Sequence, residues 1–141
     1  MKRTLISLLF GLLVTNLATA QTNVVDNTPY KIVMQLTSGD TAVHRGLIKQ
    51  INNALNAAPK SRIEVVCHNN GLFFLVSVQT CQSEAIQKLK KKGVVFVACE
   101  NSMRSHKVKR EELLPEADTV PSGVIEIVKK QGKKWAYLKA G

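Results

Sequence analysis

The sequence has few aromatic and few acidic residues. Its 141 residues include one Trp, two Tyr and four Phe, too few for an obvious platform on which nucleic-acid bases would stack. Lys and Arg number 20 against 10 Asp and Glu, a basic excess that often indicates nucleic acid or an anionic surface as partner. The shortage of aromatic residues argues against the first of these, so we expect no nucleic-acid binding.

Motifs for metal and phosphate binding are also missing. There is no C-x-x-C or H-x-x-x-H spacing, and the three cysteines, Cys67, Cys81 and Cys99, are far apart in the sequence. A Cys/His zinc site would need ligands that the sequence does not group together. The segment 37–40 (Thr-Ser-Gly-Asp) has one glycine, which falls short of a P-loop or a dinucleotide fingerprint. We therefore expect neither a metal nor a cofactor.

Long apolar runs are lacking except at the N-terminus. Lys2 and Arg3 precede a nearly continuous apolar stretch at 5–17, and an A-x-A pattern ends at Ala20. This arrangement is typical of a secretory signal peptide cleaved after Ala20, and the run is shorter than the roughly 20 residues that a membrane span needs. We divide the chain into a signal peptide at 1–20, a flexible lead-in at 21–28 and one α/β domain at 29–141.

Export would change both the charge and the cysteine chemistry. Without Lys2 and Arg3, 18 basic residues remain against 10 acidic ones, a charge of +8, in a periplasmic or secreted protein with no stable membrane anchor. An oxidising compartment allows disulfides, and an odd number of cysteines leaves at least one thiol free or paired between chains. Cys67 could pair with Cys81 and leave Cys99 free; the other interpretation is that these cysteines are small buried apolar residues.

Apolar periodicity predicts alternating strands and helices through the domain. Strands are expected at 30–36, 62–67, 94–99, 117–120 and 135–139, and helices at 41–58, 83–92, 101–114 and 124–130, with a helical turn favoured at 72–78. Near-continuous apolar strands that alternate with helices are typical of a parallel sheet covered on both faces. We predict a single-domain α/β fold with a mostly parallel five-stranded sheet. A flavodoxin-like winding would make the first and third strands neighbours.

The best candidate for chemistry is Cys99, which ends the apolar run 94–98 and is followed at once by a polar segment. A thiol just before a helix N-terminus meets free N–H groups and the positive end of the helix dipole, and both lower its pKa. Arg104 and His106 lie in the following segment and would add positive charge. The alternative is a buried structural cysteine.

Other side chains are expected at the same edge of the sheet, where the segments 37–40 and 99–103 would meet in the predicted strand order. His68 follows the second strand and His44 lies in the first turn of the first helix, so both are candidates for lining a pocket there. A lone histidine is more often a packed or surface residue, which makes these two weaker candidates than the thiol. The remaining candidates for ligand binding are Ser38, Gly39, Asn101, Ser102 and Arg104.

Several segments together resemble the DsrE/DsrF-like family of sulfur-relay proteins. They are 93–103 (GVVFVACENSM), 120–124 (VPSGV) and 131–139 (QGKKWAYLK), supported by 30–58 and 64–68. The similarity covers nearly the whole domain, and it rests on the order and spacing of the segments together rather than on any one of them. The resemblance implies a small α/β sandwich that assembles as homotrimers or hexamers. It also implies that a cysteine at the position of Cys99 carries sulfur as a persulfide.

These observations lead to two functional hypotheses. The first is an exported sulfur carrier or sulfurtransferase whose Cys99 thiolate receives sulfane sulfur from a donor protein and passes it on by thiol exchange. The second is a non-catalytic oligomeric protein that binds a small anionic ligand or a partner segment, with Cys99 as part of the pocket lining.

Overall fold

The computed structural model describes residues 25–141; the predicted signal peptide at 1–20 and the first half of the lead-in lie outside the described residues. Five strands form one sheet in the order β4-β3-β2-β1-β5, and every neighbouring pair is parallel. The strands are β1 (Lys31–Leu36), β2 (Arg62–Cys67), β3 (Val95–Cys99), β4 (Ala117–Val120) and β5 (Ala136–Lys139).

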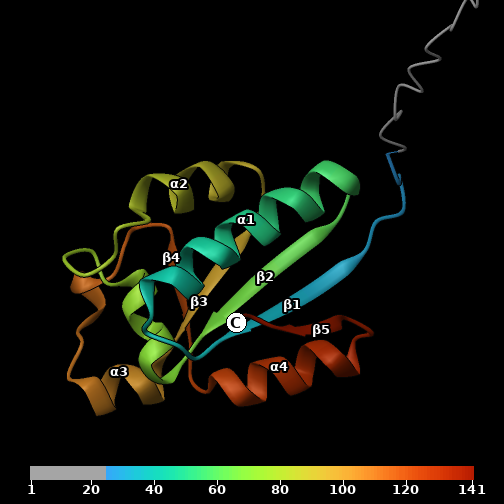
Figure 1. Ribbon diagram of the computed structural model, residues 1–141. Coiled ribbons are helices and arrows are strands. Elements are labelled where there is room, and N and C mark those ends of the chain that lie inside the picture. Colours follow the sequence, from blue (N-terminus) through green and yellow to red (C-terminus); the bar gives the residue numbers. More distant parts are fainter. Residues whose placement is uncertain (1–24) are drawn as a thin grey trace, which may run out of the picture.

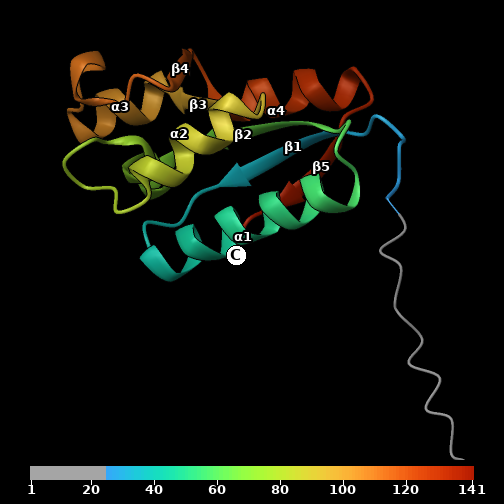
Figure 2. The ribbon, with the colours of Figure 1, turned by 90° about the horizontal axis from the view of Figure 1, so that it is seen from above.

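Helices cover both faces of this sheet. They are α1 (Thr41–Ala57), α2 (Ser83–Lys91), α3 (Glu100–His106) and α4 (Gly123–Gly132), with two 3-10 segments, η1 (Asn69–Leu75) and η2 (Arg110–Glu112). In Figure 1, α1 and α2 lie above the strands and α4 lies below them. Figure 2 shows α1 and α4 on opposite sides of β1. The predicted class, a single-domain α/β fold with a five-stranded parallel sheet between helices, is confirmed.

The predicted neighbourhood of the first and third strands is wrong, because β2 lies between β1 and β3. The chain adds β2, β3 and β4 outward from β1, and then returns to place β5 on the other side of β1. Strand order therefore reverses between β1 and β5. Since parallel crossovers are right-handed, the reversed direction of the last crossover puts α4 on the face opposite α1.

Local chemistry explains where the long helices begin. The Asp40 carboxylate accepts a hydrogen bond from the backbone N–H of Ala42 over 2.7 Å and so caps the start of α1. The Ser122 hydroxyl accepts from the N–H of Ile125 in the same manner at the start of α4. Both caps fix a helix N-terminus close to the carboxyl ends of the strands.

Two of the expected helices differ from the prediction. The helix expected at 101–114 is broken, because Lys107 adopts the left-handed conformation (φ 55°) and ends α3 after seven residues. The turn expected at 72–78 is the 3-10 segment η1, which ends at Leu75. Val76 then forms an antiparallel bridge with Leu113, and Val78 is 86% exposed.

Two cores of unequal size lie on the two faces of the sheet. The larger contains side chains from α1, α2 and η1, among them Leu47, Phe74 and Ile86. The smaller has four buried members, Val33, Val66 and Val97 from three adjacent strands and Ile127 from α4. Side chains alternate along a strand, so the residue two positions after Val97 also faces α4. That residue is Cys99.

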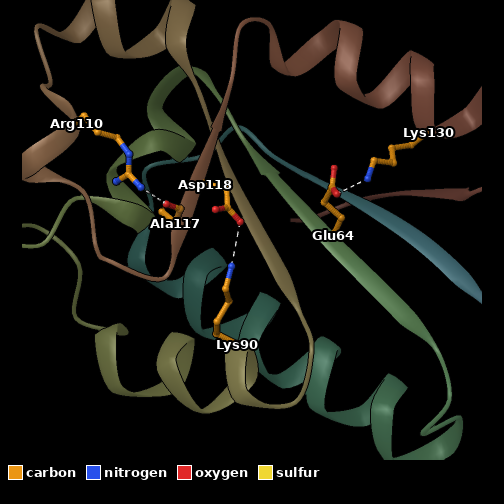
Figure 3. Close-up of polar contacts among 6 residues, drawn as sticks. All are labelled: Glu64, Lys90, Arg110, Ala117, Asp118 and Lys130. Atoms are coloured by element: carbon orange, nitrogen blue, oxygen red, sulfur yellow. Dashed lines mark hydrogen bonds and ion pairs between the residues drawn. The ribbon is translucent and has the colours of Figure 1, made fainter.

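Polar contacts connect the layers at the edges of these cores (Figure 3). The Lys130 ammonium of α4 binds the buried Glu64 carboxylate of β2, and lies 3.5 Å from Glu126. On β4, Asp118 pairs with Lys90 of α2 over 3.0 Å, and Arg110 donates to the carbonyl of Ala117 over 2.6 Å. Within residues 25–141, no helix is both long and apolar enough to cross a membrane.

Candidate functional site

Cys99 is the last residue of β3 and the residue that precedes the first turn of α3. Its Sγ accepts a hydrogen bond from the backbone N–H of Gly123, the first residue of α4, over 3.2 Å. The thiol therefore lies between the starts of two helices, one that follows it in the chain and one that begins 24 residues later. Only 4% of the residue is exposed.

The surroundings of this thiol favour the thiolate. Burial by itself raises the pKa of Cys99, but hydrogen bonds from the backbone N–H of Gly123, from the backbone and hydroxyl of Ser102 and from the backbone of Asn101 outweigh it. The net result is a pKa below the ordinary value for cysteine. Hydrogen bonds donated to an anion stabilise it relative to the neutral form, which is the physical cause of this shift.

Ser102 has two roles at the site. Its hydroxyl oxygen accepts from the backbone N–H of Asn69 over 2.7 Å, which ties α3 to the start of η1. The hydroxyl proton remains for the sulfur of Cys99, and the residue is only 9% exposed. The structure thus places Ser102 and Asn101, which the sequence analysis named as site candidates, beside the thiol.

Gly123 permits the close approach of α4 to the sheet. A methyl group added at its Cα would lie 3.1 Å from Val66 Cγ1, 3.2 Å from His68 Cβ and 3.3 Å from Cys99 Cβ, closer than ordinary carbon contacts. Only a residue without Cβ fits here without displacing its neighbours. The segment 120–124 carried the family resemblance, but sequence reasoning did not identify this glycine as part of the site.

His68 directly follows β2, and its Cβ, like that of Cys99, lies close to Gly123 at the start of α4. The parallel register of β2 and β3 ends with Cys67 opposite Ala98, the residues directly before His68 and Cys99. His68 Nε2 is 2.7 Å from the amide nitrogen of Gln35 on β1, and the Tyr137 hydroxyl of β5 donates to the amide oxygen of Gln35. Burial lowers the pKa of His68. Gln35 and Tyr137 were missed by sequence reasoning, although a glutamine inside the apolar run of β1 is an unusual residue there.

The other residues predicted near the first strand have local contacts. His44 Nε2 is 2.8 Å from the carbonyl of Ser38, and its ring packs edge-on against Phe74 with centroids 5.0 Å apart. Gly39 lies against Asn70 of η1. Ser38, Gly39 and His44 thus shape the β1–α1 loop against η1, and none of these contacts is with Cys99. Their predicted role in binding stays a prediction.

Arg104 belongs to a different part of the surface. It donates to the Asn101 side chain and lines an open pocket of about 610 Å³ that does not include Cys99. His106, also on α3, packs edge-on against Phe73 with centroids 4.8 Å apart. Besides Arg104 the pocket is lined by Glu100, Met103, Lys107, Val108, Lys109, Arg110 and Thr119. Four cationic residues against one carboxylate make this pocket suitable for anions.

The remaining cysteines differ from Cys99 in their environments. Cys67 is fully buried in the larger core, where burial raises its pKa strongly and keeps it a neutral thiol. Cys81 is exposed before α2, and all three cysteines are unpaired. Among residues 25–141 no group of three or more His, Cys, Asp or Glu side chains is arranged to hold a metal ion.

Comparison with known proteins identifies the family. The model of the DsrE/DsrF-like family matches residues 31–140. The fold is similar to that of MTH1491, a protein of unknown function from Methanobacterium thermoautotrophicum, with a TM-score of 0.75, 32% identity, and coverage of 78% of this chain and 98% of that one. No curated protein matches the sequence.

More distant structures share the fold alone. A conserved protein of unknown function from Bacteroides thetaiotaomicron, BT1422, has 14% identity and a TM-score of 0.56 over 77% of this chain and 93% of its own. The ychN protein of E. coli has 10% identity and a TM-score of 0.56 over 79% and 99%. With the family model matching more than three quarters of its length, the chain belongs to the DsrE/DsrF-like family.

Proposed function

We propose that the protein is a sulfane-sulfur carrier that holds sulfur as a persulfide on Cys99. The observation that supports this most is the hydrogen bond from the backbone N–H of Gly123 to the sulfur, which together with donors of Ser102 and Asn101 lowers the pKa of Cys99. The thiolate, rather than the thiol, attacks sulfur. Membership of the DsrE/DsrF-like family supports a role in sulfur relay.

The proposed step is a balanced exchange between thiols. The Cys99 thiolate attacks the outer sulfur of a donor persulfide R–S–SH, a new S–S bond forms at Sγ, and the donor's S–S bond breaks. The donor leaves as the thiolate R–S⁻, so no external oxidant or reductant is needed. Transfer to an acceptor thiolate repeats the same exchange in the forward direction. The N–H groups that face Sγ stabilise the anion before the attack.

The test is the mass of the protein after incubation with cysteine persulfide. The exposed Cys81 would also react, so the experiment uses a Cys81→Ser background and compares it with the same background carrying Cys99→Ser. We expect the gain of one sulfur atom per chain, located by peptide mapping at Cys99, and its loss in the double variant. An equal gain in both proteins would refute the proposal.

We also propose that the protein acts after export. The support is the N-terminal pattern: Lys2 and Arg3, the apolar stretch 5–17 and the A-x-A pattern ending at Ala20. The mature protein would then begin at Gln21 in the periplasm or outside the cell. N-terminal sequencing of the protein recovered from the exported fraction checks this, and a protein retaining Met1 in the cytosolic fraction would contradict it.

The alternative function, ligand or partner binding without catalysis, is supported by two observations. Cys99 is only 4% exposed, and the cation-lined pocket beside Arg104 does not include it. The predicted pocket-lining role of Cys99 is not part of this alternative, because the cation-lined pocket does not include the thiol, so Cys99→Ser should leave ligand-induced stabilisation intact. A thermal-shift series with small anions on the native protein and on Cys99→Ser distinguishes this function from sulfur transfer.

Self-association, as a trimer or hexamer, is a further part of the proposal. Three aliphatic side chains on the outer surface of α4, those of Val124, Ile125 and Val128, are 54%, 51% and 57% exposed. A contiguous apolar surface of this kind often marks a protein interface.

A further inference from the structure

The imidazole of His68 is held by a chain of hydrogen bonds that crosses three strands. His68 follows β2, and its Nε2 lies 2.7 Å from the amide nitrogen of Gln35 on β1. The hydroxyl of Tyr137 on β5 donates to the amide oxygen of the same glutamine. Both ends of the Gln35 side chain are therefore engaged, and its NH₂ group is turned toward the histidine ring.

This arrangement determines where the ring carries its proton. An amide NH₂ group can donate a hydrogen bond but cannot accept one, so Nε2 of His68 must present its lone pair to Gln35. In a neutral imidazole the proton then sits on the other nitrogen, Nδ1. We infer that Gln35 and Tyr137 are positioning residues that hold His68 as the neutral Nδ1–H tautomer beside Cys99.

The surrounding groups disfavour a positively charged ring. The N-terminus of α4, which is the positive end of its dipole, lies close to this histidine, since a Cβ on Gly123 would approach His68 Cβ to 3.2 Å. From β3, Cys99 lies near the same helix start, since a Cβ on Gly123 would approach its Cβ to 3.3 Å, and the Tyr137 phenol of β5 is linked to the ring through Gln35. The carboxylate on the same face of β2, that of Glu64, is engaged by Lys130 and does not serve the histidine. Burial lowers the pKa of His68, in agreement with a neutral ring.

The consequence concerns how the thiolate of Cys99 arises. In many cysteine enzymes the thiolate is half of an ion pair with a histidinium, which requires a ring protonated on both nitrogens. Here the ring is kept neutral, so the N–H groups of Gly123, Ser102 and Asn101 would stabilise the thiolate without it. The inference concerns the same site as the proposed sulfur transfer, but it does not require that transfer to occur.

Nuclear magnetic resonance of the ¹⁵N-labelled protein reads the tautomer directly. At neutral pH we expect the Nε2 resonance of His68 at the position of an unprotonated ring nitrogen and the Nδ1 resonance at that of a protonated one. Assignment comes from the loss of these signals in His68→Ala. A native protein with its proton on Nε2, or with both nitrogens protonated, would overturn the inference.

A charge-changing variant tests the role of Gln35. In Gln35→Glu the carboxylate accepts from Nε2–H, so we expect the proton to move to Nε2 and the pKa of His68 to rise by about one unit or more, a tenfold change in its ionisation equilibrium. The pH profile of Cys99 alkylation, a single ionisation in the native protein, would gain a second step. Gln87→Glu adds the same charge on the exposed surface of α2 and serves as the matched control.

Tyr137→Phe tests the other end of the chain. Without the phenol the Gln35 amide is free to rotate, so we expect a second His68 tautomer to appear in the ¹⁵N spectrum, whereas Tyr30→Phe at an exposed position leaves the spectrum unchanged. If Gln35→Glu shifts His68 no more than Gln87→Glu, or if Tyr137→Phe leaves the single tautomer in place, the positioning role is refuted. Persulfide formation is measured separately by mass spectrometry, so the tautomer inference and the sulfur-transfer proposal can fail independently.

Discussion

The backbone N–H of Gly123 donates a hydrogen bond to Sγ of Cys99 across 3.2 Å, and thereby joins the start of α4 to the end of β3. This contact spans 24 residues of sequence. It links the reactivity of the thiol to the packing of a helix on the sheet. Changes at either residue should therefore alter both stability and thiol chemistry.

Gly123→Ala should lower the stability of the fold and also weaken the stabilisation of the Cys99 thiolate. The new methyl group would meet Val66, His68 and Cys99 at 3.1–3.3 Å, so α4 must shift outward and the N–H to sulfur bond must lengthen. We expect a loss of about 1–3 kcal/mol in the free energy of unfolding, and a higher pKa for Cys99, measured by urea unfolding and by the pH dependence of alkylation. Gly132→Ala, at the other end of α4 with open space around its Cα, is the control and should not destabilise.

Ser102→Ala should raise the pKa of Cys99 without moving α4. The change removes a donor to the sulfur and leaves the N–H of Asn69 without its acceptor, which costs about 1–3 kcal/mol when the group is buried. The alkylation profile of Cys99 should move to higher pH. Ser105→Ala removes an exposed hydroxyl that donates to the carbonyl of Asn101, and an equal shift in that variant would contradict the assigned role.

The three cysteines should react in different ways with iodoacetamide. Cys67 is fully buried with a raised pKa, so we expect labelling only when the protein unfolds. Cys81 is exposed and should be labelled at once. Cys99 combines a lowered pKa with 4% exposure, so its labelling should be slow but should persist at pH values where a free thiol peptide no longer reacts. Peptide mapping over time separates the three, and labelling of Cys67 in the folded protein would contradict this order.

Much of the fold could be predicted from the sequence, because strands buried on both faces appear as apolar runs and the helices between them have their own period. Strand order could not, since nothing local in 136–139 says that β5 pairs with β1 rather than with β4. The end of α3 was missed because Lys107, and not a glycine, adopts the left-handed conformation there.

Only part of the candidate site could be predicted from the sequence, because several of its contacts depend on the strand order. Cys99 and Ser102 were found because a strand end and the following helix are neighbours in the chain. Gln35 was not, because its partners His68 and Tyr137 lie 33 and 102 residues away, and only the strand order brings them together. Gly123 was part of a matched segment, but its closeness to the thiol depends on how α4 returns across the sheet.

The pair of Glu64 and Lys130 should make stability depend on pH. Burial raises the pKa of Glu64 above 4.5, and the hydrogen bond and charge of Lys130 offset this only in part. Folding then favours the protonated carboxyl: its contribution is fully present below pH 4.5 and is lost as pH rises through the folded-state pKa. Glu64→Gln should remove this decline in urea-unfolding measurements from pH 4 to 8, whereas a matched change at the exposed Glu84 should not.

Removing the cation of the Glu64–Lys130 pair should destabilise the protein at neutral pH. Lys130→Met leaves the Glu64 carboxylate buried without its cation, and we expect a loss of roughly 3 kcal/mol at neutral pH. Replacing both residues by Met should restore most of that loss, because no uncompensated charge remains buried. A double variant as unstable as the single one would show that packing, and not charge, is responsible.

Val128→Glu should prevent the proposed self-association. The side chain is 57% exposed on α4, so a charge there is harmless to the monomer but costly inside an apolar interface. We expect a smaller sedimentation coefficient in analytical ultracentrifugation with an unchanged circular dichroism spectrum. Val78→Glu, at a valine that is 86% exposed before α2, is the matched control. A native protein that sediments as a monomer would contradict the proposal.

The unequal size of the two cores has a consequence for access to Cys99. α4 contributes one buried apolar side chain, Ile127, to the core on its face of the sheet, whereas α1 contributes Leu47 and Ile51 to a core shared with α2 and η1. Regions with fewer buried apolar contacts open locally at lower free energy than the whole protein unfolds. The amides of α4 should therefore exchange with deuterium before those of α1. Reagents too large to enter the folded site would reach the thiol through that local opening, at a rate set by α4 and not by global unfolding.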